Sequence, residues 1–216
     1  MPMDEETARQ ALVAAAQDLV RLGLNSGTVG NLSLRHGAGL LITPTGIAPD
    51  VMTADQIVAM DSAGNSQGKW APSSEWDIHL RIMAARPDVG AVIHAHPDHC
   101  VALSCLRQPI PAFHYMVAGF GGDEVPCADY ACFGSPELAE TVVAALGTQL
   151  HGCLMANHGM VATGPDLATA LARTAKLETL ARQFLLARAL GAPVLLTQAE
   201  MAAVKNRYKS YGKQPG

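Results

Sequence analysis

Apolar residues recur along this chain with two spacings that alternate from segment to segment. Near the N-terminus they fall every three or four positions between Ala8 and Leu22, which predicts a helix capped by Asp4 and ended at Gly23. Capping residues, a proline at the first helical position or a glycine stop support the other predicted helices. These span residues 73–83, 135–147, 165–190 and the segment that follows a capping box at Thr197 and Glu200.

Short apolar runs without helical spacing lie between these helices and predict strands. The runs cover residues 32–34, 40–42, 58–60, 91–96 and 153–158, while 109–116 is expected to be loop and strand. Helices and strands interleave, but tight turns separate several of them, which favours one α/β layer structure with a mixed or largely antiparallel sheet. The 216 residues contain no repeat or dividing linker, so we expect a single domain over residues 1–216.

Two histidines interrupt the apolar run from Ala91 to Pro97. Successive side chains of a strand point to opposite faces, so His94 and His96 share one face, with their Cα atoms about 7 Å apart. Pro97 ends the strand, which places the pair at an end of the sheet that faces a cleft. A single histidine on an apolar strand is more often a hydrogen-bonded core residue than a ligand, but two neutral imidazoles buried side by side favour a bridging metal ion.

A third histidine, His158, closes the later apolar run that begins at Cys153. If a neighbouring strand brings it to the same end of the sheet, three histidines can hold a metal ion and leave one coordination position open. That arrangement is typical of catalytic zinc sites, whereas structural zinc sites are closed by four protein ligands. Cys100 lies close to the histidine pair in sequence, but we interpret it as a small buried apolar residue.

Segments rich in small polar residues and glycine indicate where an anion could bind. Ser73 is the expected N-cap of the helix at 73–83, so Ser74 and Glu75 fall in its first turn, where free backbone N–H groups attract phosphate. A first-turn glutamate also has a purely structural interpretation, since it meets the helix dipole favourably. The segments 25–31 and 43–46 carry similar groups, although each alone is most simply a turn.

Composition excludes several classes of protein. The net charge is −4 and no basic run appears, which argues against nucleic acid as a partner. No apolar stretch reaches the roughly 20 residues that span a membrane, and the acidic start of the chain argues against a targeting peptide. Five cysteines without a C-x-x-C pair fit reduced thiols in a cytoplasmic protein. Only 16% of the residues are charged, so we expect subunit interfaces to cover part of the surface.

Seven short motifs, spread in order over nearly the whole chain, resemble the class II aldolase/adducin family and, within it, the L-fuculose-1-phosphate aldolases. The motifs are Gly30-Asn31-Leu32-Ser33, Thr43-Pro44-Thr45-Gly46, Pro72-Ser73-Ser74-Glu75, His94-Ala95-His96, His114-Tyr115-Met116, Asn157-His158-Gly159 and Lys209-Ser210-Tyr211-Gly212. The resemblance implies a three-layer αβα fold with a central mixed, mostly antiparallel sheet. It also implies one Zn²⁺ per subunit, with Mn²⁺ or Co²⁺ as alternatives, held by His94, His96 and His158.

The same resemblance implies roles for residues outside the histidine set. Glu75 lies beside the metal and moves protons, with its status as a further metal ligand left open. Tyr115 and Tyr211 reach the active site of a neighbouring subunit in a homotetramer and handle the proton on the aldehyde oxygen. The phosphate of a sugar substrate is held by Gly30, Asn31, Thr45, Gly46, Ser73 and Ser74.

The implied activity is the reversible cleavage of a ketose 1-phosphate to dihydroxyacetone phosphate and an aldehyde. L-Fuculose 1-phosphate fits, and so do 5-deoxyribulose 1-phosphate and its methylthio analogue, because an aldehyde pocket discriminates a methylene by only about 1–3 kcal/mol. The same scaffold also carries pentulose-phosphate 4-epimerases and decarboxylases of phosphorylated sugar acids. A non-catalytic interaction module, as in adducin, is a further alternative, which the intact set of three histidines and Glu75 disfavours.

Overall fold

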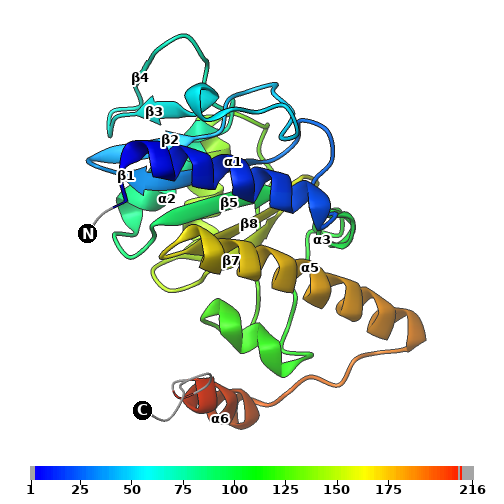
Figure 1. The fold of residues 1–216 in the computed structure, drawn as a ribbon. Helices are drawn as coiled ribbons and strands as arrows, with labels where there is room; N and C mark the ends of the chain where they lie inside the picture. The colour runs from blue at the N-terminus through cyan, green and yellow to red at the C-terminus, as the bar shows by residue number, and fades with distance from the viewer. Residues whose placement is uncertain (1–2, 209, 211–216) are drawn as a thin grey trace.

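The computed structural model describes residues 3–208 and 210. Within these residues, an eight-stranded sheet with the order β4-β3-β2-β1-β5-β8-β7-β6 forms the centre (Figure 1). Among the described strands, neighbours are antiparallel except β6 and β7, which confirms the expected mixed, mostly antiparallel sheet. The strands are β1 Asn31–His36, β2 Gly39–Ile42, β3 Val58–Met60, β4 Ser66–Gln67, β5 Ala91–Ala95, β6 Cys127–Ala128, β7 Gly152–Met155 and β8 Gly159–Gly164.

Helices cover both faces of the sheet and give the expected three layers. One face packs against α1, α3 and α5, and the other against α2 and α4. In Figure 1, α6 is set apart from these layers and lies beside the 3-10 segment η2. The helical elements are α1 Glu5–Arg21, η1 Ala54–Gln56, α2 Trp76–Ala85, α3 Asp98–Ser104, η2 Tyr115–Phe120, α4 Pro136–Leu146, α5 Leu167–Leu190 and α6 Gln198–Tyr208. None of the helices in the described part of the chain combines the length and apolar character needed to cross a membrane.

Alternation along β5 separates the two apolar cores and places the first histidine. Ala91, Ile93 and Ala95 belong to the core under α1, α3 and α5, whereas Val92 belongs to the core under α2 and α4. A fully buried aliphatic side chain such as Ile93 contributes about 1.5–3 kcal/mol. His94 follows on the same face as Val92 and is fully buried, so the strand that carries it is held from both sides.

Local signals predicted most helix ends correctly. Asp4 and Ser135 each accept a hydrogen bond from the backbone N–H three residues further on, as N-caps do. The Thr197 and Glu200 capping box also forms. The long helix begins slightly later than predicted, because Asp166 rather than the preceding proline provides its cap.

The prediction that Ser73 caps the helix at 73–83 is wrong. The α2 helix begins at Trp76, and Glu75 occupies its N-cap position. The backbone N–H of Ser73 donates to the Thr43 carbonyl, so Pro72 and Ser73 run along the end of β2, and residues 74 and 75 form a turn that leads into the helix. Ser74 and Glu75 therefore lie before the first helical turn.

Two further predictions need correction in detail. Residues 109–116 contain a single antiparallel bridge, from Ile110 to Val125, and then enter η2 at Tyr115. The apolar run 153–158 is strand only as far as Met155, so His158 lies in the turn between β7 and β8. The short strands β4 and β6, and all of β8, were not predicted.

Candidate active site

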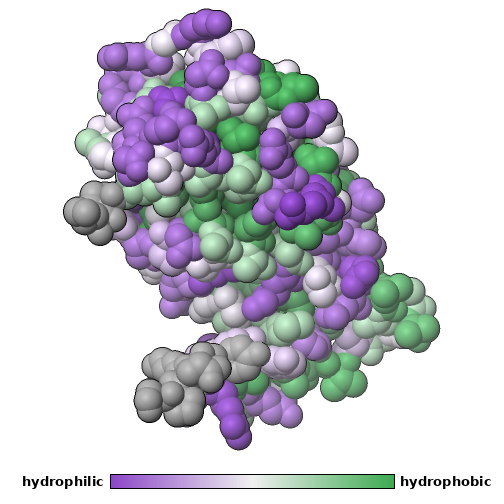
Figure 2. All heavy atoms as spheres, viewed as in Figure 1, coloured by the Kyte–Doolittle hydropathy of each residue, from purple (hydrophilic) through white to green (hydrophobic). Residues whose placement is uncertain are grey.

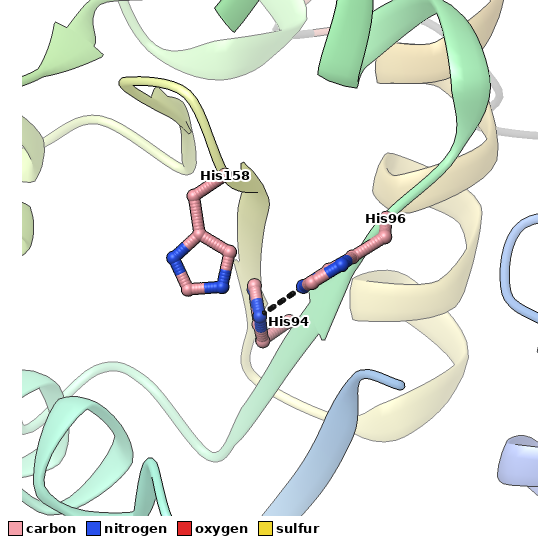
Figure 3. Close-up of side chains that lie close together, drawn as sticks. All are labelled: His94, His96 and His158. Carbon is pink, nitrogen blue, oxygen red and sulfur yellow. Dashed lines mark hydrogen bonds between the residues drawn. The ribbon is translucent and has the colours of Figure 1, made fainter. Parts of the chain in front are cut away.

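Three histidines from two separate parts of the chain meet at one end of the sheet. His94 lies in β5, His96 lies just beyond it, and His158 lies in the turn that leads into β8, the neighbour of β5. One ring nitrogen from each of the three lies within 4.8 Å of the other two. Figure 3 shows the rings converging, with the two Nε2 atoms of His94 and His96 only 2.8 Å apart. The predicted juxtaposition of the three residues is therefore present.

The contact made by His94 selects which of its nitrogens faces the cluster. Its Nδ1 lies 2.9 Å from the carbonyl oxygen of Met160, which can only accept, so Nδ1 carries the proton. The lone pair of Nε2 then points toward the Nε2 of His96. Two imidazole nitrogens brought together in this way fit a shared cation, and the hydrogen bond at the other nitrogen is the usual support for a histidine that binds metal.

The backbone around the other two histidines is held by partly buried hydrogen bonds to side chains. The backbone N–H of His96 donates to Asn25 Oδ1 at 2.9 Å, and that of His158 donates to Ser104 Oγ at 3.2 Å. Gly159 allows the turn to pass close by, because a Cβ there would lie 2.9 Å from the ring of His96. These contacts give each histidine its own support outside the cluster.

Burial keeps these imidazoles in the form that binds metal. Burial, together with the neighbouring His94 and His158, lowers the pKa of His96 to about 3. Burial and the neighbouring His94 also lower the pKa of His158. Neutral imidazole is the form that coordinates a metal, so the donor set fits a divalent ion such as zinc.

Glu75 faces the same cluster from the start of α2. Only 6% of this residue is exposed, and its Oε2 lies 3.2 Å from His94 Nε2 and 3.0 Å from the donating Nδ2 of Asn31. Burial alone would raise the pKa of Glu75, but its contacts with His94, His158 and the donating Asn31 lower it to about 2, so the carboxylate is ionised. Its Oε1 lies 3.3 Å from His158 Nε2 and has no hydrogen-bond partner among the described residues, a buried acceptor that a cation would satisfy.

A cavity of about 360 Å³ opens beside Glu75. His96 and His158 line it, whereas His94 is covered. All of the residues predicted to hold phosphate also line it: Gly30, Asn31, Thr45, Gly46, Ser73 and Ser74. The structure therefore joins the loops at 25–31, 43–46 and 72–75, which were separate signals in the sequence, into the wall of one cavity.

Glycine is required at position 30 of this wall. The backbone there has φ +76°, a conformation that residues with a Cβ rarely adopt. A Cβ would also lie 2.8 Å from the carbonyl oxygen of His94 and closer still to Asn25. Gly30 thus lets the loop run directly against the strand that carries the histidines.

Known proteins with similar sequences show which family this chain belongs to. The family model of the class II aldolase and adducin N-terminal domain matches residues 10–185. The chain belongs to the class II aldolase and adducin family. It is 44% identical to a 5-methylthioribulose-1-phosphate/5-deoxyribulose-1-phosphate aldolase of Rhodospirillum rubrum, over 98% of this chain and 96% of that protein. It is 41% identical to the L-fuculose phosphate aldolase of Escherichia coli K12, over 97% of this chain and 98% of that protein.

Solved structures of this family have the same fold. An L-fuculose 1-phosphate aldolase superposes with a TM-score of 0.90 and 38% identity, covering 94% of this chain and 96% of that chain. These likenesses confirm the resemblance read from the seven motifs, and they make the chain an aldehyde-lyase of the class II aldolase type.

The cavity also has lining residues that the sequence did not reveal. Tyr130 and Phe133 are 58% and 70% exposed, and they stand on the loop between β6 and α4. Isolated aromatic residues in a loop carry no periodic signal. Asn157 also lines the cavity beside the third histidine, with a left-handed backbone, φ +54°, that asparagine adopts more readily than most residues.

The structure does not bring Tyr115, one of the two predicted catalytic tyrosines, to the histidines of the same subunit. Tyr115 is 51% exposed and lies at the start of η2, where it lines a separate cavity of about 430 Å³ with Lys176 and Tyr208. Tyr211 lies outside the described residues. The expectation that both tyrosines serve a neighbouring subunit stays a prediction.

Proposed function

We propose that this chain catalyses the reversible cleavage of a ketose 1-phosphate to dihydroxyacetone phosphate and an aldehyde. One observation carries the proposal: the ionised Glu75, two of the three clustered histidines and all six predicted phosphate contacts line a single cavity. A substrate whose phosphate lies on the loops around Asn31 and Ser73 then has its reacting carbons beside Glu75. The names of the relatives describe the same reaction type.

The proposed metal is Zn²⁺, held by His94, His96 and His158. The convergence of their nitrogens, their neutral state and the unpartnered Oε1 of Glu75 support this assignment. A bound zinc ion would supply Lewis-acid polarisation of the ketone oxygen of the substrate. The chain's own contribution is to hold the three donors in place before the ion arrives.

In the proposed mechanism Glu75 moves a proton at carbon. In the direction of aldol formation, its ionised carboxylate takes a proton from the carbon of dihydroxyacetone phosphate that attacks the aldehyde, and in cleavage it returns that proton. Burial beside the histidines keeps bulk water away from this exchange. Tyr115 or Tyr211 of a neighbouring subunit gives a proton to the aldehyde oxygen as the carbon–carbon bond forms, and takes it back in cleavage.

Phosphate binding at the other end of the cavity uses small groups rather than a cluster of cations. Asn31, Ser73 and Ser74 supply amide and hydroxyl groups, and Thr45 and Gly46 form the facing loop. Ser73 is 5% exposed and Asn31 is 4% exposed, so these groups are preorganised by the fold. Donors fixed in this way lose little conformational freedom when an anion binds.

The experiment that tests the function is a panel of ketose 1-phosphates incubated with the zinc-loaded protein. We expect release of dihydroxyacetone phosphate, trapped by a coupled reductase, with L-fuculose 1-phosphate, 5-deoxyribulose 1-phosphate and 5-methylthioribulose 1-phosphate ranked by kcat/KM. Epimerisation of a pentulose phosphate without release would contradict the proposal, and so would carbon dioxide release from a phosphorylated sugar acid.

We further propose a homotetramer in which each subunit is a single domain over residues 1–216 and the active site is completed at an interface. The exposed Tyr115 supports this, and so does the apolar surface at the end of α5 and the linker to α6, which Figure 2 shows in green. Its exposed residues are Leu186, Leu190, Val194 and Leu195. Mixing tests the arrangement: a Tyr211→Phe subunit co-assembled with a Glu75→Gln subunit recovers activity if the tyrosine serves a neighbour, and recovers none if it serves its own site.

A further inference from the structure

A buried histidine behind the cavity links the active-site wall to the sheet. His79 lies on α2 and is fully buried, as is Ser33 on β1. The Oγ of Ser33 lies 2.7 Å from Nδ1 of His79, and the Nε2 of His79 lies 2.5 Å from Oδ1 of Asn31. Asn31 in turn donates from Nδ2 to Glu75 Oε2 at 3.0 Å. The four side chains form one continuous line of hydrogen bonds.

The chemistry of Glu75 sets the direction of every bond in this line. The Nδ2 of Asn31 lies 3.0 Å from Glu75 Oε2, which accepts its hydrogen bond, so the NH₂ group of Asn31 faces Glu75. The amide oxygen of Asn31 then faces His79, whose Nε2 must carry the proton. The remaining nitrogen, Nδ1, is left as an acceptor for the hydroxyl of Ser33.

The surroundings of His79 keep it in this single form. Burial is the largest influence and, with the neighbouring His94, lowers the pKa of His79 to about 3. The ring is therefore neutral and carries one proton. The hydroxyl of Ser33 can donate its hydrogen to Nδ1, which favours the tautomer of His79 with the proton on Nε2.

We propose that His79 is a positioning residue for the reaction, which fixes the Asn31 amide with its NH₂ group toward Glu75 and toward the bound substrate phosphate. The inference rests on the proposed function of the cavity. An amide turned over would set its oxygen beside the Glu75 carboxylate and present a second acceptor to an anionic substrate. The Nε2–H of His79 removes that alternative, because it leaves Asn31 one orientation in which both ends are satisfied.

Two substitutions at position 79 separate the two hydrogen bonds. In His79→Asn the short amide reaches Ser33 but not Asn31, while in His79→Gln the longer amide places an N–H donor near the position of Nε2. We expect His79→Asn to lower kcat/KM by about 10- to 100-fold, the range for partners that orient active-site groups. His79→Gln should restore most of that loss. His151→Asn, the same change at a half-buried histidine before β7, is the control.

A double-mutant cycle tests whether His79 acts through Asn31. In an Asn31→Ala background, His79→Asn should cost little further kcat/KM, because the group that it positions is already gone. Losses that multiply instead would overturn the proposal, and so would equal losses in the asparagine and glutamine variants. Zinc content and the melting temperature are measured for every variant, so that a merely structural loss is recognised.

A measurement on the wild-type protein keeps the inference independent of folding and of turnover. With ¹⁵N-labelled histidine, the ring nitrogens of His79 should show the neutral tautomer with the proton on Nε2. A proton on Nδ1 would overturn the proposed line of hydrogen bonds even in an active aldolase. A wild-type protein that shows the Nε2–H tautomer but cleaves no ketose 1-phosphate would instead overturn the proposed function.

Discussion

The buried wall of the cavity and its exposed rim differ in solvent exposure and in how firmly their side chains are held. In the wall, His94, Glu75 and Asn31 are between 0% and 6% exposed, and each makes hydrogen bonds that fix its orientation. On the rim, Tyr130 and Phe133 are more than half exposed. The side chains of the wall are therefore fixed in orientation before a substrate binds, whereas the exposed rings of the rim have free surface that a substrate can contact.

Arg107 links Tyr130 on the rim to the turn that carries His158. The guanidinium of Arg107 lies over the ring of Tyr130 at 5.4 Å, and its Nε donates to Asn157 Oδ1 at 2.7 Å. Both contacts are exposed, so each contributes less than a buried one would. Under the proposed function, bond cleavage takes place at the wall, and the rim contacts the variable aldehyde.

The largest effect is expected for His94→Ala. This change removes a neutral nitrogen donor from the centre of the wall, so bound zinc and aldol cleavage should both be lost. Metal content by mass spectrometry and dihydroxyacetone phosphate release measure the two losses. His36→Ala, at the far end of β1, serves as the control. One full equivalent of zinc with normal turnover in His94→Ala would exclude this residue as a ligand.

Glu75→Gln should give the next largest effect. The amide preserves the size of the side chain but cannot take a proton, so kcat should fall on the order of 10²-fold or more. Zinc should stay bound, because the three histidines are unchanged. Loss of zinc from Glu75→Gln would show that the carboxylate is chiefly a ligand, and would move Glu75 from proton transfer to metal binding.

Ser74→Ala should act on substrate binding more than on turnover. Losing one hydrogen bond to a charged group costs about 1.5–3 kcal/mol, which corresponds to a rise of roughly 10- to 100-fold in KM for a phosphorylated ketose. Because the contact is made equally in the ground state and the transition state, kcat should change little. Ser62→Ala, in an exposed turn, is the matched control. An unchanged KM would place the phosphate elsewhere.

The smallest effect is expected on the rim, from Phe133→Ala. The ring is 70% exposed, so the change should leave zinc and the fold intact. It should lower kcat/KM by about 3- to 10-fold, or about 0.7–1.4 kcal/mol, for ketoses that release an apolar aldehyde. Ketoses that release a small polar aldehyde should be affected less. Equal losses across the substrate panel would contradict a role for Phe133 in aldehyde contact.

Features set by neighbouring residues could be predicted from the sequence. The i and i+2 spacing of His94 and His96 is decisive, because the pleat of any strand sends both side chains to one face. The caps at Asp4 and Ser135 were equally local, since the capping side chain reaches a backbone group three residues away. The seven motifs, taken together, also indicated the family and the fold.

The start of α2 shows where such reasoning fails. Ser73 has the residue type of an N-cap and stands before an apolar helical pattern. Its backbone N–H, however, donates to the carbonyl oxygen of Thr43, thirty positions earlier in the chain. Propensity expresses a preference of about 1 kcal/mol, and pairing with an existing sheet outweighs it. The residues predicted to hold phosphate line the cavity even so, because the observed backbone and the predicted helix start bring the same residues there.

Residue type and short spacing along the chain are enough to identify the residues with the chemistry for a metal, a proton and a phosphate. Which of these residues meet depends on how the strands and helices pack. His158 reaches His94 because β8 pairs with β5, and His79 reaches Asn31 across 48 positions because α2 packs on the sheet. Such contacts depend on the path of the whole backbone, and no local pattern records them.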